Sequence, residues 1–326
     1  MNARATLVCA TVAAGLALPA TAQEHSFNFG HAAASSHLFH TGLEMFAELV
    51  AEKTDGRVEI NVFGDRLLGD DRQLMEGLQL GTIDGAVVSA PVIPLAVAAP
   101  AFDALQLPFV VPSYAKMGEV LSSDLGRDIL DTLGEHDIKG LGFVEAGLRH
   151  FLTRGDAVLT VADFSGLRTR IVPTPLHRAT WEAVGTSPVG LAYGEVYSAL
   201  ETGAIDAVEI NLSSIQSESL YQAAQNVTLT GHFFWPGVLM VSGPVFDGLP
   251  EDIQQAMIEA GHEVIAAHYA LAAADEAEVT ERLGAAGVTI SELAELEAMQ
   301  ARMAPVVEQW RETDPLVGRF IAAMGE

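Results

Sequence analysis

The sequence of 326 residues contains little cysteine and little positive charge. Its single cysteine, Cys9, lies near the N-terminus, and one thiol can form neither a disulfide framework nor a thiolate metal cluster within the chain. Only 17 Lys and Arg stand against 43 Asp and Glu, which gives a formal net charge of −26. A surface this acidic repels phosphate backbones, so we exclude a nucleic acid as partner.

Long uninterrupted apolar runs are also lacking. The longest run in the body of the chain, residues 86–101, contains three prolines, which break helices, so it does not predict a membrane-spanning helix. At the N-terminus, a basic start and apolar residues 5–19 are followed by Ala-Thr-Ala. This is the layout of a secretory signal peptide, and the apolar part is shorter than the roughly 20 residues of a transmembrane helix. We therefore expect cleavage after Ala22 and a periplasmic location for the mature chain, residues 23–326.

Strand and helix patterns alternate along the mature chain. We expect a strand at 27–30, a helix at 36–53, a strand at 58–62, a helix that ends at Gly81, and a buried strand at 84–89. Repeated βα units of this kind indicate an α/β fold with a mainly parallel sheet.

A short internal repeat indicates how the chain is organised. Residues 78–84, LQLGTID, resemble residues 200–206, LETGAID. Two ordinary helix–turn–strand units could match by coincidence, but we favour two similarly built lobes. After Pro250 a long helical pattern runs to about residue 284, and we expect it to tie both lobes together rather than to form a coiled coil.

Motifs for catalysis, cofactors and metals are absent. The sequence contains no G-x-S-x-G elbow, no P-loop, no dinucleotide fingerprint and no EF-hand loop, so we expect no catalytic residues and no cofactor. His31, His37 and His40 are close in sequence, but we favour a polar cleft or surface role over a metal site. His262 and His268 lack the spacing of a zinc-protease helix, and we expect both to face solvent.

Arginines are concentrated between residues 147 and 178. This segment contains five of them: Arg149, Arg154, Arg168, Arg170 and Arg178. The strand-like alternation at 166–171 places Arg168 and Arg170 on one face. A guanidinium is a planar fork that matches a carboxylate, sulfonate or phosphate, although pairing with surface carboxylates is the alternative.

Three longer segments carry a family resemblance. They read EINVFGDRLLGDDRQLMEGLQLGTID, DFSGLRTRIVPTPLHRATWEAVGTSPVGLAYGEVYSALETGAIDAVE and HFFWPGVLMVSGPVFDGLPEDIQQAM. With them, the chain resembles the DctP-type solute-binding proteins of tripartite ATP-independent periplasmic (TRAP) transporters, from Phe29 to the C-terminal helices. The resemblance implies a two-lobed α/β, periplasmic-binding-protein-like fold with a ligand cleft between the lobes and a long helix that spans both. The expected parts are lobe I at 23–146 with part of 236–275, lobe II at 147–235, the long helix at 250–284, and C-terminal helices at 285–326 that pack on the lobes.

The resemblance also implies ligand-binding positions. The last arginine of the family's G-L-K-x-R element, which grips the ligand carboxylate, corresponds to Arg170, and the ligand-facing arginine upstream corresponds to Arg149. The aromatic ring that covers the ligand corresponds to Tyr193. The amide after the D-G-x-E element is displaced by one position, to Asn211, which leaves its ligand contact open. The remaining cleft positions implied by the resemblance are Ser89, Asp71, His31 and Trp235.

The function implied by the resemblance is transport. We expect a monomeric periplasmic receptor that captures a small organic anion by cleft closure and delivers it to the TRAP membrane permease subunits. A hydroxylated or dicarboxylic acid, including a sugar acid, is the favoured ligand. A cyclic zwitterion such as ectoine and an aromatic or keto acid remain alternatives, and a secreted α/β enzyme or a ligand sensor are the alternative classes.

Overall fold

The structure is a computed structural model, and it describes residues 23–325. The predicted signal peptide, its cleavage after Ala22, and Cys9 lie outside the described residues. Within the described range, the helices are each too short or too polar to cross a membrane.

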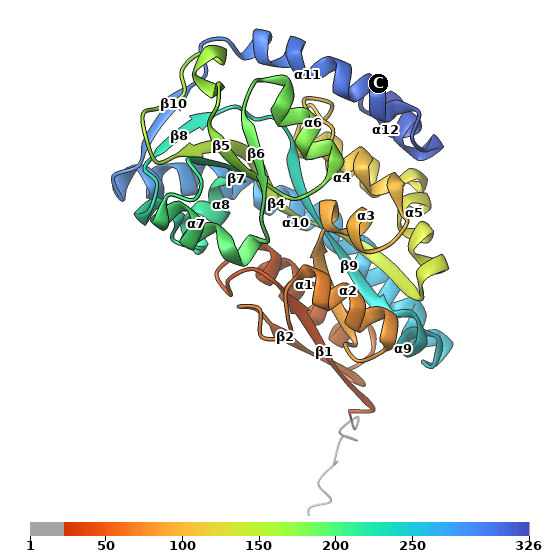
Figure 1. The fold of residues 1–326 in the computed structure, drawn as a ribbon. Coiled ribbons are helices and arrows are strands. Elements are labelled where there is room, and N and C mark those ends of the chain that lie inside the picture. The colour runs from red at the N-terminus through yellow and green to blue at the C-terminus, as the bar shows by residue number, and fades with distance from the viewer. Residues whose placement is uncertain (1–22, 326) are drawn as a thin grey trace, which may run out of the picture.

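Two sheets share one long strand, β4 (Ile138–Thr153). The strand order is β2-β1-β3-β9-β4 in the first sheet and β4-β7-β5-β6 in the second, and β8 pairs with β4 and β10 (Figure 1). The first sheet contains β1 (His25–His31), β2 (Val58–Phe63), β3 (Gly85–Ser89) and β9 (Phe234–Ser242). The second contains β5 (Arg168–Ile171), β6 (Ser187–Gly190), β7 (Ala207–Asn211), β8 (Asn226–Leu229) and β10 (Thr289–Glu292).

Helices and 3₁₀ turns connect these strands. Those that precede β4 are α1 (Leu38–Lys53), α2 (Asp71–Leu80), η1 (Ala90–Val92), α3 (Ile93–Ala96), η2 (Pro100–Gln106), α4 (Tyr114–Leu121), α5 (Asp124–Asp131) and η3 (Thr132–His136). Those between β4 and β9 are η4 (Val161–Phe164), α6 (Pro175–Ala183), η5 (Tyr193–Glu195), α7 (Val196–Thr202), α8 (Leu212–Ser217) and η6 (Leu220–Gln222). After β9 come α9 (Gly243–Asp247), α10 (Glu251–Ala285), α11 (Leu296–Arg311) and α12 (Pro315–Gly325).

The two halves repeat one order of elements. The series β1-α1-β2-α2-β3 is matched by β5-α6-β6-α7-β7, and in each series the first strand pairs in parallel with the other two. The two copies of the sequence repeat lie at the same place in each series. Gly81 and Gly203 end α2 and α7 in the left-handed conformation that glycine adopts most readily. Ser89 and Asn211, which end β3 and β7, therefore occupy matching positions, as expected for two similarly built lobes.

Helix α10 crosses behind both sheets in the view of Figure 1. It packs against α1, α4 and β4, and further along against α8 and β10. Where it crosses β4, a Cβ on Gly142 would lie 2.1 Å from the carbonyl oxygen of Gly261, and a Cβ on Gly261 would lie 2.4 Å from that of Leu141. Only glycine fits at this close approach of the two backbones.

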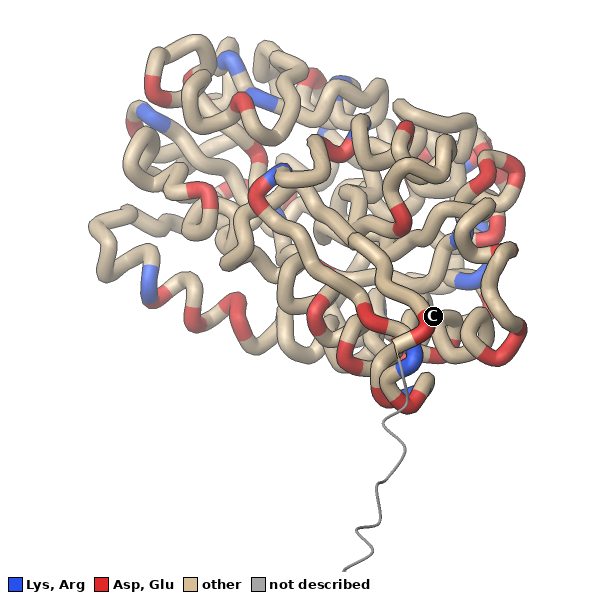
Figure 2. The backbone as a smooth tube through the Cα atoms, turned by 90° about the horizontal axis from the view of Figure 1, so that it is seen from below, with Lys and Arg blue, Asp and Glu red and all other residues tan. Residues whose placement is uncertain are grey.

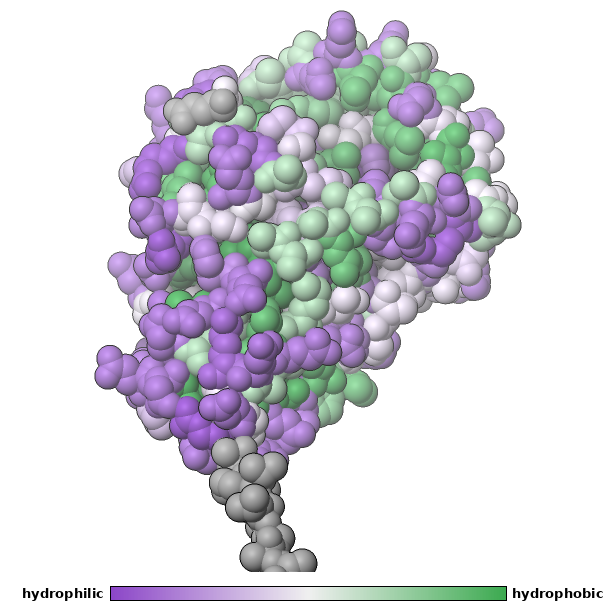
Figure 3. Space-filling model, turned by 180° about the vertical axis from the view of Figure 1, so that it is seen from behind, coloured by the Kyte–Doolittle hydropathy of each residue, from purple (hydrophilic) through white to green (hydrophobic). Residues whose placement is uncertain are grey.

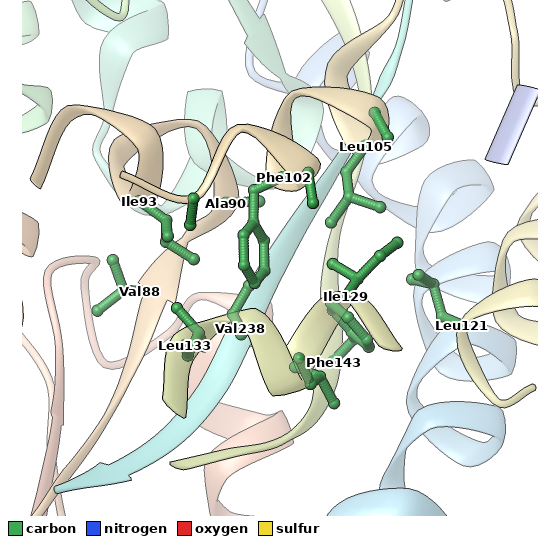
Figure 4. Close-up of a cluster of buried hydrophobic side chains, with 14 of the residues drawn as sticks. Val88, Ala90, Ile93, Phe102, Leu105, Leu121, Ile129, Leu133, Phe143 and Val238 are labelled. Atoms are coloured by element: carbon green, nitrogen blue, oxygen red, sulfur yellow. The ribbon is translucent and has the colours of Figure 1, made fainter. Parts of the chain in front are cut away.

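The largest hydrophobic cluster supports the first sheet. Phe102 packs with Val238 of β9, Ile129 and Leu133 in the interior (Figure 4). Val88 belongs to the same cluster and directly precedes Ser89, so the end of β3 has a rigid base.

The surface agrees with the composition. Acidic residues occur around the whole outline with fewer basic residues between them (Figure 2). On the face opposite to that of Figure 1, hydrophilic residues dominate the lower part, while hydrophobic residues show between polar ones higher up (Figure 3).

Candidate functional site

A cavity of about 250 Å³ lies between the two sheets. Ser89 at the end of β3 and Arg170 near the end of β5 both line it, in agreement with the rule that ligands bind beyond the carboxyl ends of parallel strands. Its wall includes Ala32, Arg66, Asp70, Asp71, Arg72, Ser89, Arg170, Val172, Leu191, Tyr193, Gly194 and Trp235. An inner recess shares several of these residues and adds His37, Phe39 and Ser214.

Arg170 has an unused donor at the cavity. Its Nε and Nη2 donate to the Leu191 carbonyl oxygen at 3.1 and 2.8 Å. Its Nη1 is buried and has no hydrogen-bond partner among the described residues. Burial lowers the pKa of Arg170 to about 10, so the guanidinium still carries its charge at neutral pH. A buried cation with a free N–H on a cavity wall is a site for an anion.

Arg149 is not among the cavity-lining residues. It forms an ion pair with Glu209 and donates to the Glu209 carbonyl oxygen, and the two side chains are 1% and 0% exposed. Its guanidinium carbon lies 3.6 Å from the ring centroid of Trp235, which does line the cavity. Arg149 is therefore placed to hold Trp235 in position rather than to touch a ligand.

Glu209 forms the centre of a buried cluster behind that wall. The cluster is completed by His177, 3.6 Å from the carboxylate, and by His232, 3.5 Å from it. Burial opposes ionisation of Glu209, yet Arg149 and the two histidines hold its pKa well below the usual value. In the sequence, Glu209 stood out only as the glutamate of the D-G-x-E element; the cluster around it was not predicted, because its partners come from strands and helices distant along the chain.

Asn211 is linked to the cavity through other residues. Its amide donates to the Ala146 carbonyl oxygen at 2.6 Å, and its side-chain oxygen accepts from Ser214 at 2.8 Å. The Tyr193 hydroxyl donates to the same Ser214 oxygen at 3.0 Å, and the Tyr193 ring lines the cavity. Asn211 thus fixes Ser214, which in turn orients the Tyr193 ring.

His37 lines the inner recess, in keeping with the polar cleft role that was one expectation for it, although it was not among the predicted ligand-binding residues. Its Nδ1 accepts from the Phe39 N–H at the start of α1, so in the neutral ring Nε2 carries the proton. Nε2 then donates to Ser214 Oγ at 3.1 Å, which joins α1 to α8 across the cleft. Burial lowers the pKa of His37 to about 3, so the ring is neutral at physiological pH.

Asp71 and Ser89 line the cavity from the first sheet. Asp70 caps α2 through a capping box with Gln73, and this fixes Asp71 as the first residue of the helix. Asp71 is 8% exposed, and burial raises its pKa to about 6, against hydrogen bonds from the Ser89 side chain and backbone that favour the charged form.

Arg66 is a second cavity residue that was not predicted from the sequence. It stands in a tight turn closed by a hydrogen bond from Leu67 N to Gly64 O, with φ of 54° at Asp65 and 61° at Arg66. Left-handed backbone at two successive non-glycine residues is strained, and such strain is found at ligand clamps. No sequence motif predicts this turn, because neither central residue is glycine or asparagine.

The Arg66 guanidinium reaches across the cleft. It donates to Glu218 at 2.9 Å, and its carbon lies 5.2 Å from the Tyr193 ring centroid. The other Glu218 oxygen accepts from Ala34 N at 2.9 Å. Glu218 follows α8, so these bonds join the two walls of the cleft.

The histidines predicted from sequence have structural partners. His31 is buried outside the cavity wall: its Nδ1 accepts from Ala33 N, and its Nε2 lies 2.9 Å from His40 Nδ1. The prediction that His268 faces solvent is wrong, because it is fully buried between the Glu145 N–H, which donates to Nδ1, and the Leu38 carbonyl oxygen. Within residues 23–325, no three His, Cys, Asp or Glu side chains are grouped so that they could hold a metal ion.

Arg168 differs from its neighbour Arg170. Its guanidinium pairs with Asp206 and donates to the Ala204 carbonyl oxygen, and the side chain is half exposed. Arg168 therefore pairs with a surface carboxylate, which was the alternative to ligand binding that we considered for these arginines from the sequence.

This geometry agrees with a match to a known family. The family described as bacterial extracellular solute-binding protein, family 7 (DctP), matches residues 29–313. The chain belongs to this family. This match confirms the resemblance to DctP-type solute-binding proteins that the three sequence segments indicated.

Individual relatives of this family 7 protein cover most of its length. A solute-binding protein of Chromohalobacter salexigens is 31% identical over 92% of this chain and 89% of its own. The sugar acid binding protein DctPAm of Advenella mimigardefordensis, solved with galactonate, has a TM-score of 0.86 at 25% identity, covering 92% of this chain and 97% of that one. A TRAP periplasmic solute-binding protein of Chromohalobacter salexigens, solved with bound D-glucuronate, has a TM-score of 0.83 at 30% identity, covering 91% and 98%. These similarities confirm the two-lobed α/β fold predicted from the resemblance.

Proposed function

We propose that this family 7 protein binds a sugar acid, a polyhydroxylated monocarboxylate, and delivers it to a TRAP permease. The observation that carries the proposal is Arg170, which lines the cavity and whose buried Nη1 has no hydrogen-bond partner among the described residues. A ligand carboxylate placed there receives a charge-assisted hydrogen bond in a site shielded from water. The relatives solved with galactonate and D-glucuronate support the same ligand class.

The rest of the cavity suits such a ligand. Tyr193 and Trp235 offer aromatic rings for the C–H faces of a sugar, while Asp71 and Ser89 offer oxygen atoms to its hydroxyls. The volume of about 250 Å³ is far larger than one water molecule needs, so the cavity has room for a small organic acid. In this proposal the ligand stabilises the closed arrangement of the two lobes, since it contacts Arg170 on one side and Asp71 on the other.

A cyclic zwitterion such as ectoine is the second candidate ligand. The observation in its favour is the buried Asp71 carboxylate, which would pair with a cationic group while Arg170 holds the carboxylate. Since the family is one of solute-binding proteins, we propose no catalytic activity, and conversion of a bound acid would contradict this.

We also propose the division into lobes. Lobe I comprises residues 23–146 with part of 236–275, and lobe II comprises 147–235. Support comes from β4, whose pairing with β9 is irregular between Glu145 and Leu148. There one Glu145 oxygen accepts from both Gly147 N and Trp235 N at 2.8 Å, which fastens the two strands that cross between the lobes. Small-angle scattering should then show a more compact protein when ligand is bound.

We propose further that the mature protein is a periplasmic monomer cut after Ala22. Intact-mass measurement of protein isolated from the periplasm should give the mass of residues 23–326. A larger mass, or a dimer in native mass spectrometry, would contradict this part of the proposal.

Calorimetry with a panel of ligands tests the function. D-galactonate and D-glucuronate should bind with dissociation constants in the micromolar range or below, whereas neutral galactose should not bind measurably. The panel should include ectoine, succinate and an aromatic keto acid. Binding of neutral sugars, or of no organic acid in the panel, would overturn the proposal.

A further inference from the structure

The charged side chains that line the cavity differ in how far other groups of the protein already pair with them. Besides Asp70, which caps α2, and Arg72, whose side chain is exposed, three charged residues line the cavity from different elements: Arg170 from β5, Asp71 from α2, and Arg66 from the turn after β2. Their partners decide which ligand charges the site can accept. The selectivity inferred from them rests on the proposed function, a site for an organic acid, and concerns which acids are accepted.

Arg170 has one nitrogen without a partner. Nε and Nη2 both donate to one carbonyl oxygen, that of Leu191, and the buried Nη1 has no hydrogen-bond partner among the described residues. One carboxylate satisfies this donor.

Arg66 is paired with a carboxylate through Nη2, although its Nε is also buried without a partner among the described residues. Its Nη2 donates to Glu218, which lies opposite it across the cleft, and the guanidinium packs over the Tyr193 ring. The side chains of Arg66 and Glu218 are 29% and 16% exposed, so the pair is partly shielded from water. A second ligand carboxylate would have to displace Glu218 from Arg66, and the carboxylate released would face the ligand as a like charge.

Asp71 lies on the same side of the cleft as Arg66. Its carboxyl is nearly buried, and the side chain and backbone of Ser89 donate hydrogen bonds to it. An ionised carboxylate can only accept hydrogen bonds, so it suits a ligand hydroxyl or ammonium and repels a carboxylate.

We infer that Asp71 makes the site selective for acids with one carboxylate and a hydroxyl-bearing far end, and excludes dicarboxylates. Such selectivity combines an attractive contact to the favoured ligand with a repulsive one to its competitor. Asp71 is thus a specificity-determining residue, whereas Arg170 is the general anion anchor. This narrows the sequence expectation, which had included dicarboxylic acids.

Gluconate and glucarate provide a matched pair of probes. They share six carbons and the same four internal hydroxyls, and differ only in a terminal CH₂OH or COO⁻. By calorimetry at about pH 8, above the raised pKa of Asp71, the wild-type protein should bind gluconate about 100-fold more tightly than glucarate. The same comparison between galactonate and galactarate should give a preference in the same direction.

Asp71→Asn should reduce this preference about tenfold or more, because a neutral amide can donate to the second carboxylate. Glu76→Gln is the matched control. It removes a charge from the exposed side of the same helix, outside the cavity wall, and it should leave the ratio of the two affinities within about twofold of wild type. An equal effect of both variants would show that overall charge, and not Asp71, sets the preference, and would overturn the inference.

The wild-type comparison stands even if Asp71→Asn does not fold. Glucarate binding as tightly as gluconate would overturn the inference and leave the proposed organic-acid function intact. Failure of all four acids, together with the D-glucuronate of the panel, would overturn both.

Discussion

Two buried arginines of this family 7 protein have opposite environments. Arg149 on β4 is 1% exposed and Arg170 on β5 is 2% exposed. The first has a buried carboxylate and an aromatic ring as partners, whereas the second has one carbonyl oxygen and a free N–H at a cavity. Burial alone therefore does not distinguish the two arginines; the proposal of a ligand contact at Arg170 is supported by its unpaired donor together with its place on the cavity wall.

The same contrast separates stability from binding. A charge that is paired inside the protein contributes to folding, and its loss leaves its partner buried and uncompensated. A charge held ready for a ligand adds little to the stability of the free protein. Substitutions that remove one kind of charge at a time test this division, and the paired arginine should give the largest effect.

Arg149→Ala should mainly destabilise the fold. It leaves Glu209 buried without its cation, which costs about 3–5 kcal/mol in the free energy of unfolding. Urea denaturation should show this loss. Glu209→Gln in the same background should recover part of it, because the amide carries no charge; no recovery in the double variant would argue against the ion pair as the cause.

Arg170→Ala should mainly abolish binding. Loss of the anion anchor should weaken the affinity for D-galactonate or D-glucuronate by about 2–5 kcal/mol, roughly tens- to thousands-fold. Its effect on unfolding should be smaller than that of Arg149→Ala. Calorimetry and urea denaturation of both variants provide the comparison, and unchanged affinity would remove Arg170 from the site.

Of the two arginines predicted from the family resemblance to bind the ligand, Arg170 lines the cavity and Arg149 is not among the lining residues. Arg170 is recognisable because the motif and the end of a parallel strand coincide. The partner of Arg149 is not, because Glu209 comes from β7, and which residues face each other depends on the β4–β7 register, set by tertiary structure. Both Gly81 and Gly203 could be read from the sequence, since a glycine at a helix end has a local cause.

Arg66 and His37 were not among the ligand-binding residues predicted from the sequence, although a polar cleft role was one expectation for His37. Arg66 reaches the cavity through a turn with two left-handed non-glycine residues, and His37 through a helix cap. Neither conformation has a residue pattern that distinguishes it from an ordinary surface loop. By contrast, Ser89, Asp71, Tyr193 and Trp235 were placed on the wall from the family pattern, and all line the cavity.

The cluster around Arg149 should also make the protein sensitive to acid. Burial lowers the pKa of His232 to about 4, against the opposing influence of Glu209, from about 6.5 in the unfolded chain. Between these values the unfolded state binds a proton that the folded state does not, so stability falls as the pH decreases from 6.5 to 4. This group alone should account for at most about 3 kcal/mol over that range.

Thermal unfolding at several pH values measures this loss. His232→Asn should show a shallower decrease in melting temperature with acid than the wild type. His262→Asn, which changes an exposed histidine on α10, should not differ from the wild type. An identical acid profile for His232→Asn and the wild type would mean that the other buried histidines cause the sensitivity.

Glu218→Gln should have the smallest effect. It extends the comparison of Arg149 with Arg170 to Arg66, which is paired within the protein as Arg149 is and lines the cavity as Arg170 does. Arg66 lines the ligand cavity and yet is paired, so it should influence closure rather than ligand anchoring. The glutamine retains an acceptor for Ala34 N but loses the charge that attracts Arg66, so the closed form should be less populated without ligand. We expect a larger radius of gyration in ligand-free scattering and an affinity reduced about two- to fivefold, in line with the modest energy of a partly exposed ion pair.

Glu263→Gln is the control. It removes the carboxylate that pairs with Lys53, between α1 and α10 and away from the cleft, and it should leave both the scattering and the affinity unchanged. If Glu218→Gln left the scattering unchanged while the affinity fell tenfold or more, Glu218 would act on the ligand, and the division between paired and free charges would not extend to Arg66.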